Sequence, residues 1–296
     1  MGFETTTYQD SEAVRITTDA IDLAAVTCCG PRICHLSLPG HENLLLWAPG
    51  QYGRGDWDLK GGHRVWATRP GADENEDTYT PDNEPCEVQI DGNSVLITGA
   101  ASTLNGTRRG MQITAFDDGY VEVDNFIIND GPMLYSAGVW ALTCTLPGED
   151  AEYAVPIGDG SSWDAFTLVS FREWAGHGQG GFADDQIRIT DDLVRLAPRG
   201  IENKRALQSH AGIIAMASPK RNVTFAKKAE FDPAGQYPLN TNIAFYIGPD
   251  NFMVEMETMG PECSLKPGQE LHHVETWVLK NTSTALDNAD AVKTLF

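Results

Sequence analysis

A short stretch of the chain combines a histidine, two arginines and a tryptophan, and it reads Lys60-Gly-Gly-His-Arg-Val-Trp-Ala-Thr-Arg-Pro70. Carboxylates follow soon afterwards in Pro81-Asp-Asn-Glu-Pro85. The two glycines let the backbone turn sharply or let a ligand approach closely. An indole face stacks on C–H groups, and charged groups bond to hydroxyls or to an acidic substituent, so these residue types together favour sugar binding. The alternative is a surface loop with a buried Trp and a solvated Arg.

Two carboxylates near the end of the chain are the second chemical signal. Glu255 and Glu257 lie in the run Phe252–Glu257, which we expect to be a strand, and a spacing of two places both on one face. Buried without partners they would be costly, so a place in a binding cleft would explain them. A solvent-exposed face would make both ordinary. In a cleft, such groups are candidates for general acid and base catalysis.

The elements that must position these residues are short strands. Apolar or alternating runs recur along the chain, separated by Gly, Pro, Asp and Asn. Hairpins are expected around Asp91-Gly92-Asn93 and around Asp118-Gly119. Only Ser283–Phe296 suggests a helix. Many strands with almost no helix predict an all-β sandwich or barrel, and no linker or repeat divides residues 1–296 into further domains.

Composition narrows the classes of function. The 296 residues include 21 basic and 42 acidic ones, and the formal charge of −21 makes nucleic acid and anionic membranes unfavourable partners. The sequence shows neither a signal peptide nor an apolar run that could cross a membrane, so we expect a cytoplasmic protein, or a periplasmic or secreted one if a leader has been removed. We expect the six cysteines to be buried free thiols. The oligomeric state is left open.

Segments with recognisable motifs follow one another along the chain, among them Gly61-Gly-His-Arg-Val-Trp66 and Glu275-Thr-Trp277; they are residues 24–38, 42–47, 61–66, 123–131, 139–143, 252–261 and 265–277. In their order and spacing these segments resemble the galactose mutarotase (aldose 1-epimerase) superfamily, and in particular a bacterial mutarotase-like branch with a Gly-Gly-x-Arg-x-Trp signature. The resemblance implies a single-domain β-supersandwich with a carbohydrate cleft on the concave face of its main sheet. It also implies that a Glu on a late strand takes the proton of the anomeric hydroxyl, while a His protonates the ring oxygen.

The resemblance assigns roles to particular residues. Glu255 matches the catalytic Glu, Glu257 the following Gln, and Arg64 the sugar-binding Arg. The chain departs from the pattern after the strand that Trp140 begins, because Cys144-Thr145-Leu146 stands where mutarotases carry the acid His. His63, His177 and His210 are the candidate replacements for that His.

The sequence therefore predicts a mutarotase-like isomerase acting on a free sugar or sugar acid. The alternatives are a polysaccharide lyase or glycoside hydrolase acting on a uronate-containing glycan, and a non-catalytic sugar-binding protein. The expected ligand is a small sugar or an oligosaccharide. No cofactor or metal is expected, with calcium at the acidic run Asp73-Glu-Asn-Glu-Asp77 as an alternative. The candidate catalytic residues are Glu255, Glu257, His210, His177 and His63; the candidate substrate-binding residues are Arg64, Trp66, Arg69, Asp82, Asn83, Trp140 and Tyr246.

Overall fold

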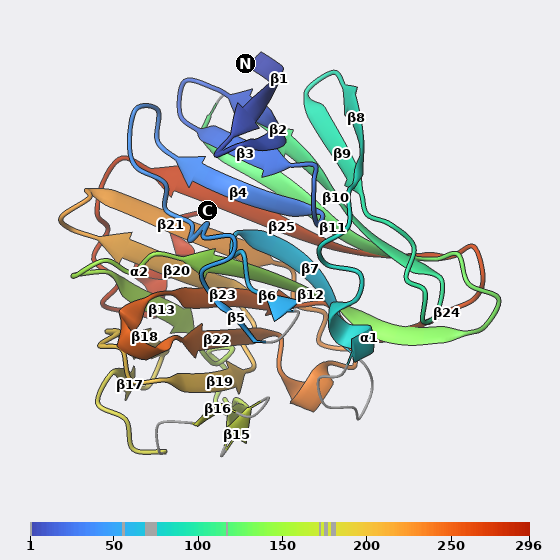
Figure 1. Ribbon diagram of the computed structural model, residues 1–296. Coiled ribbons are helices and arrows are strands. Elements are labelled where there is room, and N and C mark those ends of the chain that lie inside the picture. Colours follow the sequence, from blue (N-terminus) through green and yellow to red (C-terminus); the bar gives the residue numbers. More distant parts are fainter. Residues whose placement is uncertain are drawn as a thin grey trace.

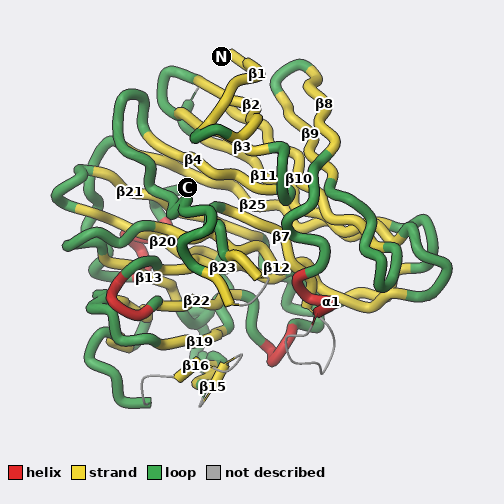
Figure 2. The backbone as a smooth tube through the Cα atoms, in the orientation of Figure 1, coloured by secondary structure: helices red, strands yellow, loops and turns green. Residues whose placement is uncertain are grey.

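Two large antiparallel β-sheets are stacked face to face (Figure 1). The computed structural model describes residues 2–54, 57–68, 76–116, 118–171, 173–174, 177–178 and 182–296. Strands dominate the backbone, and the described residues contain only two short α-helices and two short 3-10 helices (Figure 2). The all-β sandwich expected from the sequence is confirmed.

The first sheet contains eleven strands within the described ranges, in the order β1-β2-β3-β4-β7-β12-β23-β22-β19-β14, with β24 pairing to β12. Their bounds are β1 Gly2–Tyr8, β2 Ser11–Thr17, β3 Asp22–Val26, β4 Arg32–Ser37, β7 His63–Thr68, β12 Tyr135–Thr145, β23 Val254–Met259, β22 Ile243–Ile247, β19 Asn203–Leu207, β14 Leu168–Ser170 and β24 Cys263–Leu265.

The second sheet contains ten strands in the same part of the chain, in the order β17-β18-β13-β20-β21-β25-β11-β10-β9-β8. Their bounds are β17 Ile187–Ile189, β18 Leu193–Leu196, β13 Glu152–Pro156, β20 Ile213–Ser218, β21 Val223–Ala229, β25 Glu270–Lys280, β11 Tyr120–Asn129, β10 Thr107–Ala115, β9 Ser94–Thr98 and β8 Glu87–Asp91. The smaller elements are β5 Gly53–Arg54, β6 Trp57–Asp58, β15 Glu173–Trp174, β16 His177–Gly178, α1 Glu76–Tyr79, α2 Ala289–Lys293 and the 3-10 helices Pro238–Asn240 and Pro249–Asn251.

The core lies between the two sheets and follows from the alternation of side chains along each strand. Val65 and Val139 of the first sheet meet Val123 and Phe225 of the second in one buried apolar cluster. Burying each such side chain stabilises the fold by about 1.5–3 kcal/mol. Because one face of each central strand fills this core, residues of the opposite parity must lie on the outer faces.

The structure confirms the two hairpins predicted from the sequence and shortens the helix predicted at the C-terminus. Strands β8 and β9 form the expected hairpin, and so do β10 and β11. The helix predicted over Ser283–Phe296 is limited to Ala289–Lys293, where Asn288 caps the first turn by accepting from the backbone N–H of Ala291. Leu286, Ala289, Val292 and Leu295 of this segment are all buried, but Leu286 and Leu295 pack without helical backbone. Among the described residues no helix is long and apolar enough to cross a membrane.

The cysteines also differ in part from expectation. All six are free thiols, and Cys29, Cys34 and Cys144 are buried as expected. Cys28 and Cys263 are exposed, however, so burial was wrong for these two.

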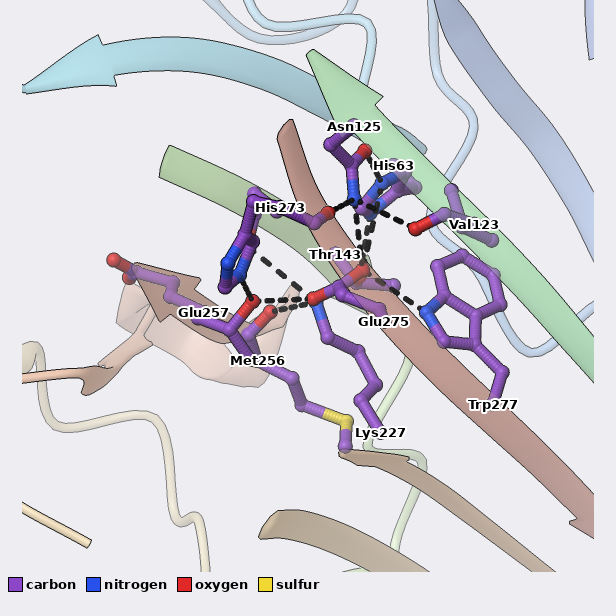
Figure 3. A network of polar contacts seen from close by, with 12 residues as sticks. His63, Val123, Asn125, Thr143, Lys227, Met256, Glu257, His273, Glu275 and Trp277 are labelled. Atoms are coloured by element: carbon purple, nitrogen blue, oxygen red, sulfur yellow. Dashed lines mark hydrogen bonds and ion pairs between the residues drawn. The ribbon is translucent and has the colours of Figure 1, made fainter. Parts of the chain in front are cut away.

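A polar network lies inside the otherwise apolar core (Figure 3). Lys227 of β21 and Glu275 of β25 form a fully buried ion pair, with 2.6 Å between Nζ and Oε1. Glu275 also accepts hydrogen bonds from the hydroxyl of Thr258 and from Nε1 of Trp277, the latter at 3.0 Å. The carboxylate therefore has donors from both sheets around it, which a buried charge requires.

His63 of β7 belongs to this network. Its Nδ1 lies 2.8 Å from the hydroxyl of Thr143, and its Nε2 lies 2.9 Å from Oδ1 of Asn125. Since an amide oxygen only accepts, Nε2 carries the proton and Nδ1 accepts from Thr143. The hydroxyl of Thr143 in turn accepts from Lys227 at 2.9 Å, so the hydrogen bonds run from the ammonium through the hydroxyl to a neutral imidazole.

Burial governs the protonation of the two network histidines. It lowers the pKa of His63 to about 4 and that of His273 to about 4, and the charge of Lys227 adds to the effect, while Glu275 opposes it. Burial alone would raise the pKa of Glu275, but the neighbouring Lys227 outweighs it and brings that pKa to about 2. Both imidazoles are thus neutral in the folded protein at neutral pH.

We expect the protein to lose stability as the pH falls from 6.5 to 4. In this window the unfolded chain binds protons at His63 and His273 that the folded chain does not, so unfolding becomes more favourable by up to about 1.4 kcal/mol per pH unit for each residue. Urea unfolding followed by Trp fluorescence measures this slope. His273→Gln should flatten it, whereas Val274→Thr, a change at the exposed and non-titrating neighbour on the same strand, should not. Equal slopes in the two variants would contradict this account.

Candidate functional site

The register of the central strands gathers charged residues on the outer face of the first sheet. Arg64 of β7 lies opposite Leu142 of β12, which lies opposite Glu257 of β23. Two residues further along β12, and so on the same face, Cys144 lies opposite Glu255. Because Val65, Val139 and other residues of the opposite parity fill the core, these side chains lie on the face turned away from the second sheet.

Arg64 and Glu255 are in direct contact, although 191 residues separate them in the sequence. Nη2 of Arg64 donates to Oε1 of Glu255 at 2.7 Å, and its Nη1 donates to Sγ of Cys144 at 2.9 Å. The thiol in turn donates to Oε1 of Glu255 at 3.5 Å. All three side chains are buried, and burial raises the pKa of the Cys144 thiol to about 12, so it remains protonated as a donor.

Trp66 supports this group rather than offering a bare stacking surface. The guanidinium of Arg64 lies over the Trp66 ring, 4.1 Å from its centroid. Tyr79 of α1 meets the ring edge-on at 4.3 Å, and Trp140 does so at 5.6 Å. Helix α1 lies beside β7 (Figure 1), and through Tyr79 it contacts this aromatic cluster.

The second carboxylate has partners of its own. Glu257 accepts from Nζ of Lys204 at 2.7 and 2.9 Å and from Nε1 of Trp140 at 2.9 Å. The ammonium also lies 5.0 Å from the centroid of the Trp140 ring. Lys204 was missed in the sequence because Asn203-Lys-Arg-Ala-Leu207 begins with three polar residues and did not stand out as a strand. The sequence offers one indication that this segment is a strand: Lys204 and Ala206 alternate with their neighbours. The same alternation is common on strands whose polar face is solvated.

The two carboxyl groups have opposite pKa shifts. Burial alone would raise the pKa of Glu255, but the charges of Arg64 and Lys204 outweigh it and lower that pKa. Burial raises the pKa of Glu257, the charge of Glu255 adds to this, and Lys204 opposes it. Residues two apart on a strand lie roughly 7 Å apart. The lowered pKa favours the ionised form of Glu255, and the raised pKa favours the protonated form of Glu257, so their surroundings drive the two carboxyl groups apart.

A second arginine extends the same face. Arg32 of β4 lies opposite Arg64, and its Nη2 lies 2.7 Å from Oδ2 of Asp82. Asp82, predicted as a sugar ligand, therefore anchors Arg32, and its neighbour Asn83 is exposed. Arg32 itself was not among the predicted site residues, although it lies within the first segment that carries the resemblance.

Tyr246 of β22 lies opposite Glu255 and is also on this face. Its hydroxyl donates to Glu202, so it too is anchored by a carboxylate.

Three buried donors on this face lack a hydrogen-bond partner among the described residues: Nε of Arg32, Nε of Arg64 and Nε1 of Trp66. Buried polar groups nearly always have partners, so such donors on adjoining strands mark a place where a ligand oxygen could bind. In the described part of the chain no group of three or more His, Cys, Asp or Glu side chains could hold a metal ion. Residues 73–75 of the acidic run considered for calcium lie outside the described residues.

The prediction that His63 shares this site is wrong. His63 precedes Arg64 by one residue, so the alternation of β7 turns it to the opposite face, into the network between the sheets. The hydrogen bonds of His63 to Thr143 and Asn125 make it a buried structural residue. Figure 3 shows the complementary case, in which the side chain of Glu257 points away from that network.

The other predicted residues are not joined to this group by any described contact. His210 stacks on Phe231 with 4.8 Å between ring centroids, and its Nδ1 lies 3.9 Å from Asp159. Arg69 lies outside the described residues. For His177 the structure describes the backbone, in β16, and not the side chain. The structure places Arg64, Trp66, Trp140, Tyr246, Glu255 and Glu257 on one face of the first sheet. Their catalytic and binding roles stay predictions.

No family model matches the sequence, and neither does any curated protein. Solved structures do match. A TPR-domain containing protein from Parabacteroides distasonis superposes with a TM-score of 0.64 at 16% identity, covering 93% of this chain and 48% of that one, so this chain spans about half its length. A galactose mutarotase-like protein from Lactobacillus casei gives 0.60 at 12% identity, covering 90% and 100% of the two chains.

A galactose mutarotase related enzyme from Lactobacillus acidophilus is similar to the same extent, with a TM-score of 0.59 at 12% identity and coverage of 93% and 99%. Identities this low carry the fold and not the activity. All three superpositions extend over at least 90% of this chain. The protein therefore has the galactose mutarotase-like fold.

Proposed function

We propose that this protein is a mutarotase-like isomerase that interconverts the anomers or epimers of a free sugar or sugar acid by acid–base catalysis. The observation that carries the proposal is the buried Arg64–Glu255 pair, held on the outer face of the first sheet beside donors that lack partners. The lowered pKa keeps the Glu255 carboxyl ionised at neutral pH, which is the form that can accept the proton of an anomeric hydroxyl. Ring opening and closure from the other face would complete the reaction.

The reaction also needs a group that gives a proton to the ring oxygen. His63 is excluded by its position between the sheets, and no described contact connects His210 with Glu255. The Lys204–Glu257 pair lies on the same face as Glu255, and the raised pKa of Glu257 favours its protonated form, so we assign this pair the role of acid in place of the missing His. The unpartnered nitrogens of Arg32 and Trp66 would bond to sugar hydroxyls.

The charge of this face argues against an acidic glycan. A lyase needs an excess of positive charge to neutralise a uronate. Here every described cation of the face has a carboxylate partner: Arg32 pairs with Asp82, Arg64 with Glu255 and Lys204 with Glu257. The pairs leave the face close to neutral, which favours a neutral sugar over a uronate-containing chain.

We expect wild-type protein to interconvert the anomers of at least one sugar in a panel of mono- and oligosaccharides followed by NMR. Glu255→Gln should slow this by roughly 10²–10⁴-fold, because an amide cannot take the proton. Sugar binding, measured by calorimetry, should persist. Glu270→Gln, an exposed carboxylate on β25, is the matched control. A rise in ultraviolet absorbance from an unsaturated uronate would instead identify a lyase, and binding without turnover of any sugar would identify a binding protein.

Arg64→Ala should change the pH dependence of the rate rather than only weaken binding. Removing the guanidinium takes away the nearest charge that lowers the pKa of Glu255, so that pKa rises and the carboxylate is protonated at higher pH. The acid limb of the pH–rate profile should therefore move to higher pH. Arg108→Ala, which breaks an ion pair with Asp130 far from this face, should leave the limb in place. An unmoved limb in Arg64→Ala would show that Glu255 is not the titrating base.

A further inference from the structure

The first sheet carries a set of polar residues on each of its faces: the network between the sheets on the inner face and the charged group on the outer face. On the same strands, each residue of the inner set lies next in sequence to a residue of the outer set. His63 precedes Arg64 on β7, and Thr143 precedes Cys144 on β12. On β23 Met256, whose backbone carbonyl joins the inner set, lies between Glu255 and Glu257. Any shift of these three strands relative to one another moves both sets together.

Lys227 connects the second sheet to two of these strands at once. Its Nζ donates to the backbone carbonyl of Met256 at 3.1 Å and to that of Ala141 at 3.4 Å, besides the hydroxyl of Thr143 at 2.9 Å. Ala141 and Thr143 belong to β12, and Met256 belongs to β23. A single ammonium, fully buried and paired with Glu275, thus bonds to the backbones of both strands directly behind the outer-face carboxylates.

Stability alone does not account for this arrangement. A buried ion pair must offset the loss of hydration of both charges, and well-packed apolar residues in its place are often as stable or more so. Besides stability, the pair provides geometric constraint, because a hydrogen bond has a preferred distance and angle and so fixes the position of its acceptor. The acceptors here include two carbonyls of the strands that carry Cys144, Glu255 and Glu257.

We propose that Lys227, held by Glu275, is a positioning residue for the outer face. By bonding to β12 and β23 from inside the sandwich, it fixes Glu255 against Arg64 and Cys144, and it fixes Glu257 against Lys204 and Trp140. Its effect on the reaction rate rests on the proposed function, whereas its effect on the geometry of the face does not. A displacement of about 1 Å at a reacting group can reduce the rate roughly 10²-fold.

The test uses the full chain with both network charges removed, in Lys227→Met/Glu275→Gln, so that no unpaired charge stays buried. The readout is the indole N–H signal of Trp140 in ¹H–¹⁵N spectra without sugar, assigned with Trp140→Phe, because this group donates to Glu257. We expect the signal to move, while that of Trp47, which packs in a separate apolar cluster, stays. Ile97→Ala, buried in the same core on β9, is the control for lost stability and should leave the Trp140 signal in place.

Activity gives the second readout. The double variant should lose roughly 10²-fold in kcat with little change in KM, and Ile97→Ala should retain kcat. If the double variant does not fold, Thr143→Val, which removes the bridging hydroxyl, should move the Trp140 signal, and Thr143→Ser should restore it. An unmoved Trp140 signal in a folded variant of either kind would overturn the proposal. Absence of turnover in the wild type would overturn the proposed function alone, since the Trp140 signal would still decide the positioning role.

Discussion

Alternation of side chains along β7, β12 and β23 is the constraint on which the other features depend. One face of each strand carries the apolar side chains that fill the core. The register between neighbouring strands then determines which polar side chains meet on the opposite, outer face. Because the period is two, a slip of one residue would exchange Arg64 for His63 and so exchange the outer group for the inner network. The apolar core therefore fixes the chemistry of the outer face as well as the fold.

The second constraint is that buried charge must be paired. Ion pairs whose cation is buried join different strands or segments of the described chain, among them Arg32–Asp82, Arg64–Glu255, Lys204–Glu257 and Lys227–Glu275. Removing one partner of such a pair typically costs about 3–5 kcal/mol, because it leaves the other charge uncompensated. Each pair therefore ties two distant parts of the sequence to one another, and a change in one member alone lowers the stability of the fold.

Local patterns were sufficient for the fold and for part of the site. Turn residues such as Asp91-Gly92-Asn93 predicted hairpins, and the spacing of Glu255 and Glu257 predicted a shared face. The same alternation, applied to His63 and Arg64, already separates them, so that error was avoidable. Lys204 was not predictable in this way, because its contact with Glu257 depends on the order β19-β22-β23, which short-range patterns do not encode.

The ion pairs on the outer face of the first sheet affect how the protein responds to ionic strength. The chain carries a formal charge of −21, and dissolved salt screens the field of such a surface strongly. Charges that are buried and matched in pairs are screened far less. A neutral ligand bound among Arg32, Arg64 and Lys204 would therefore be held with nearly the same affinity in dilute buffer and in brine, even though the rest of the surface behaves very differently in the two.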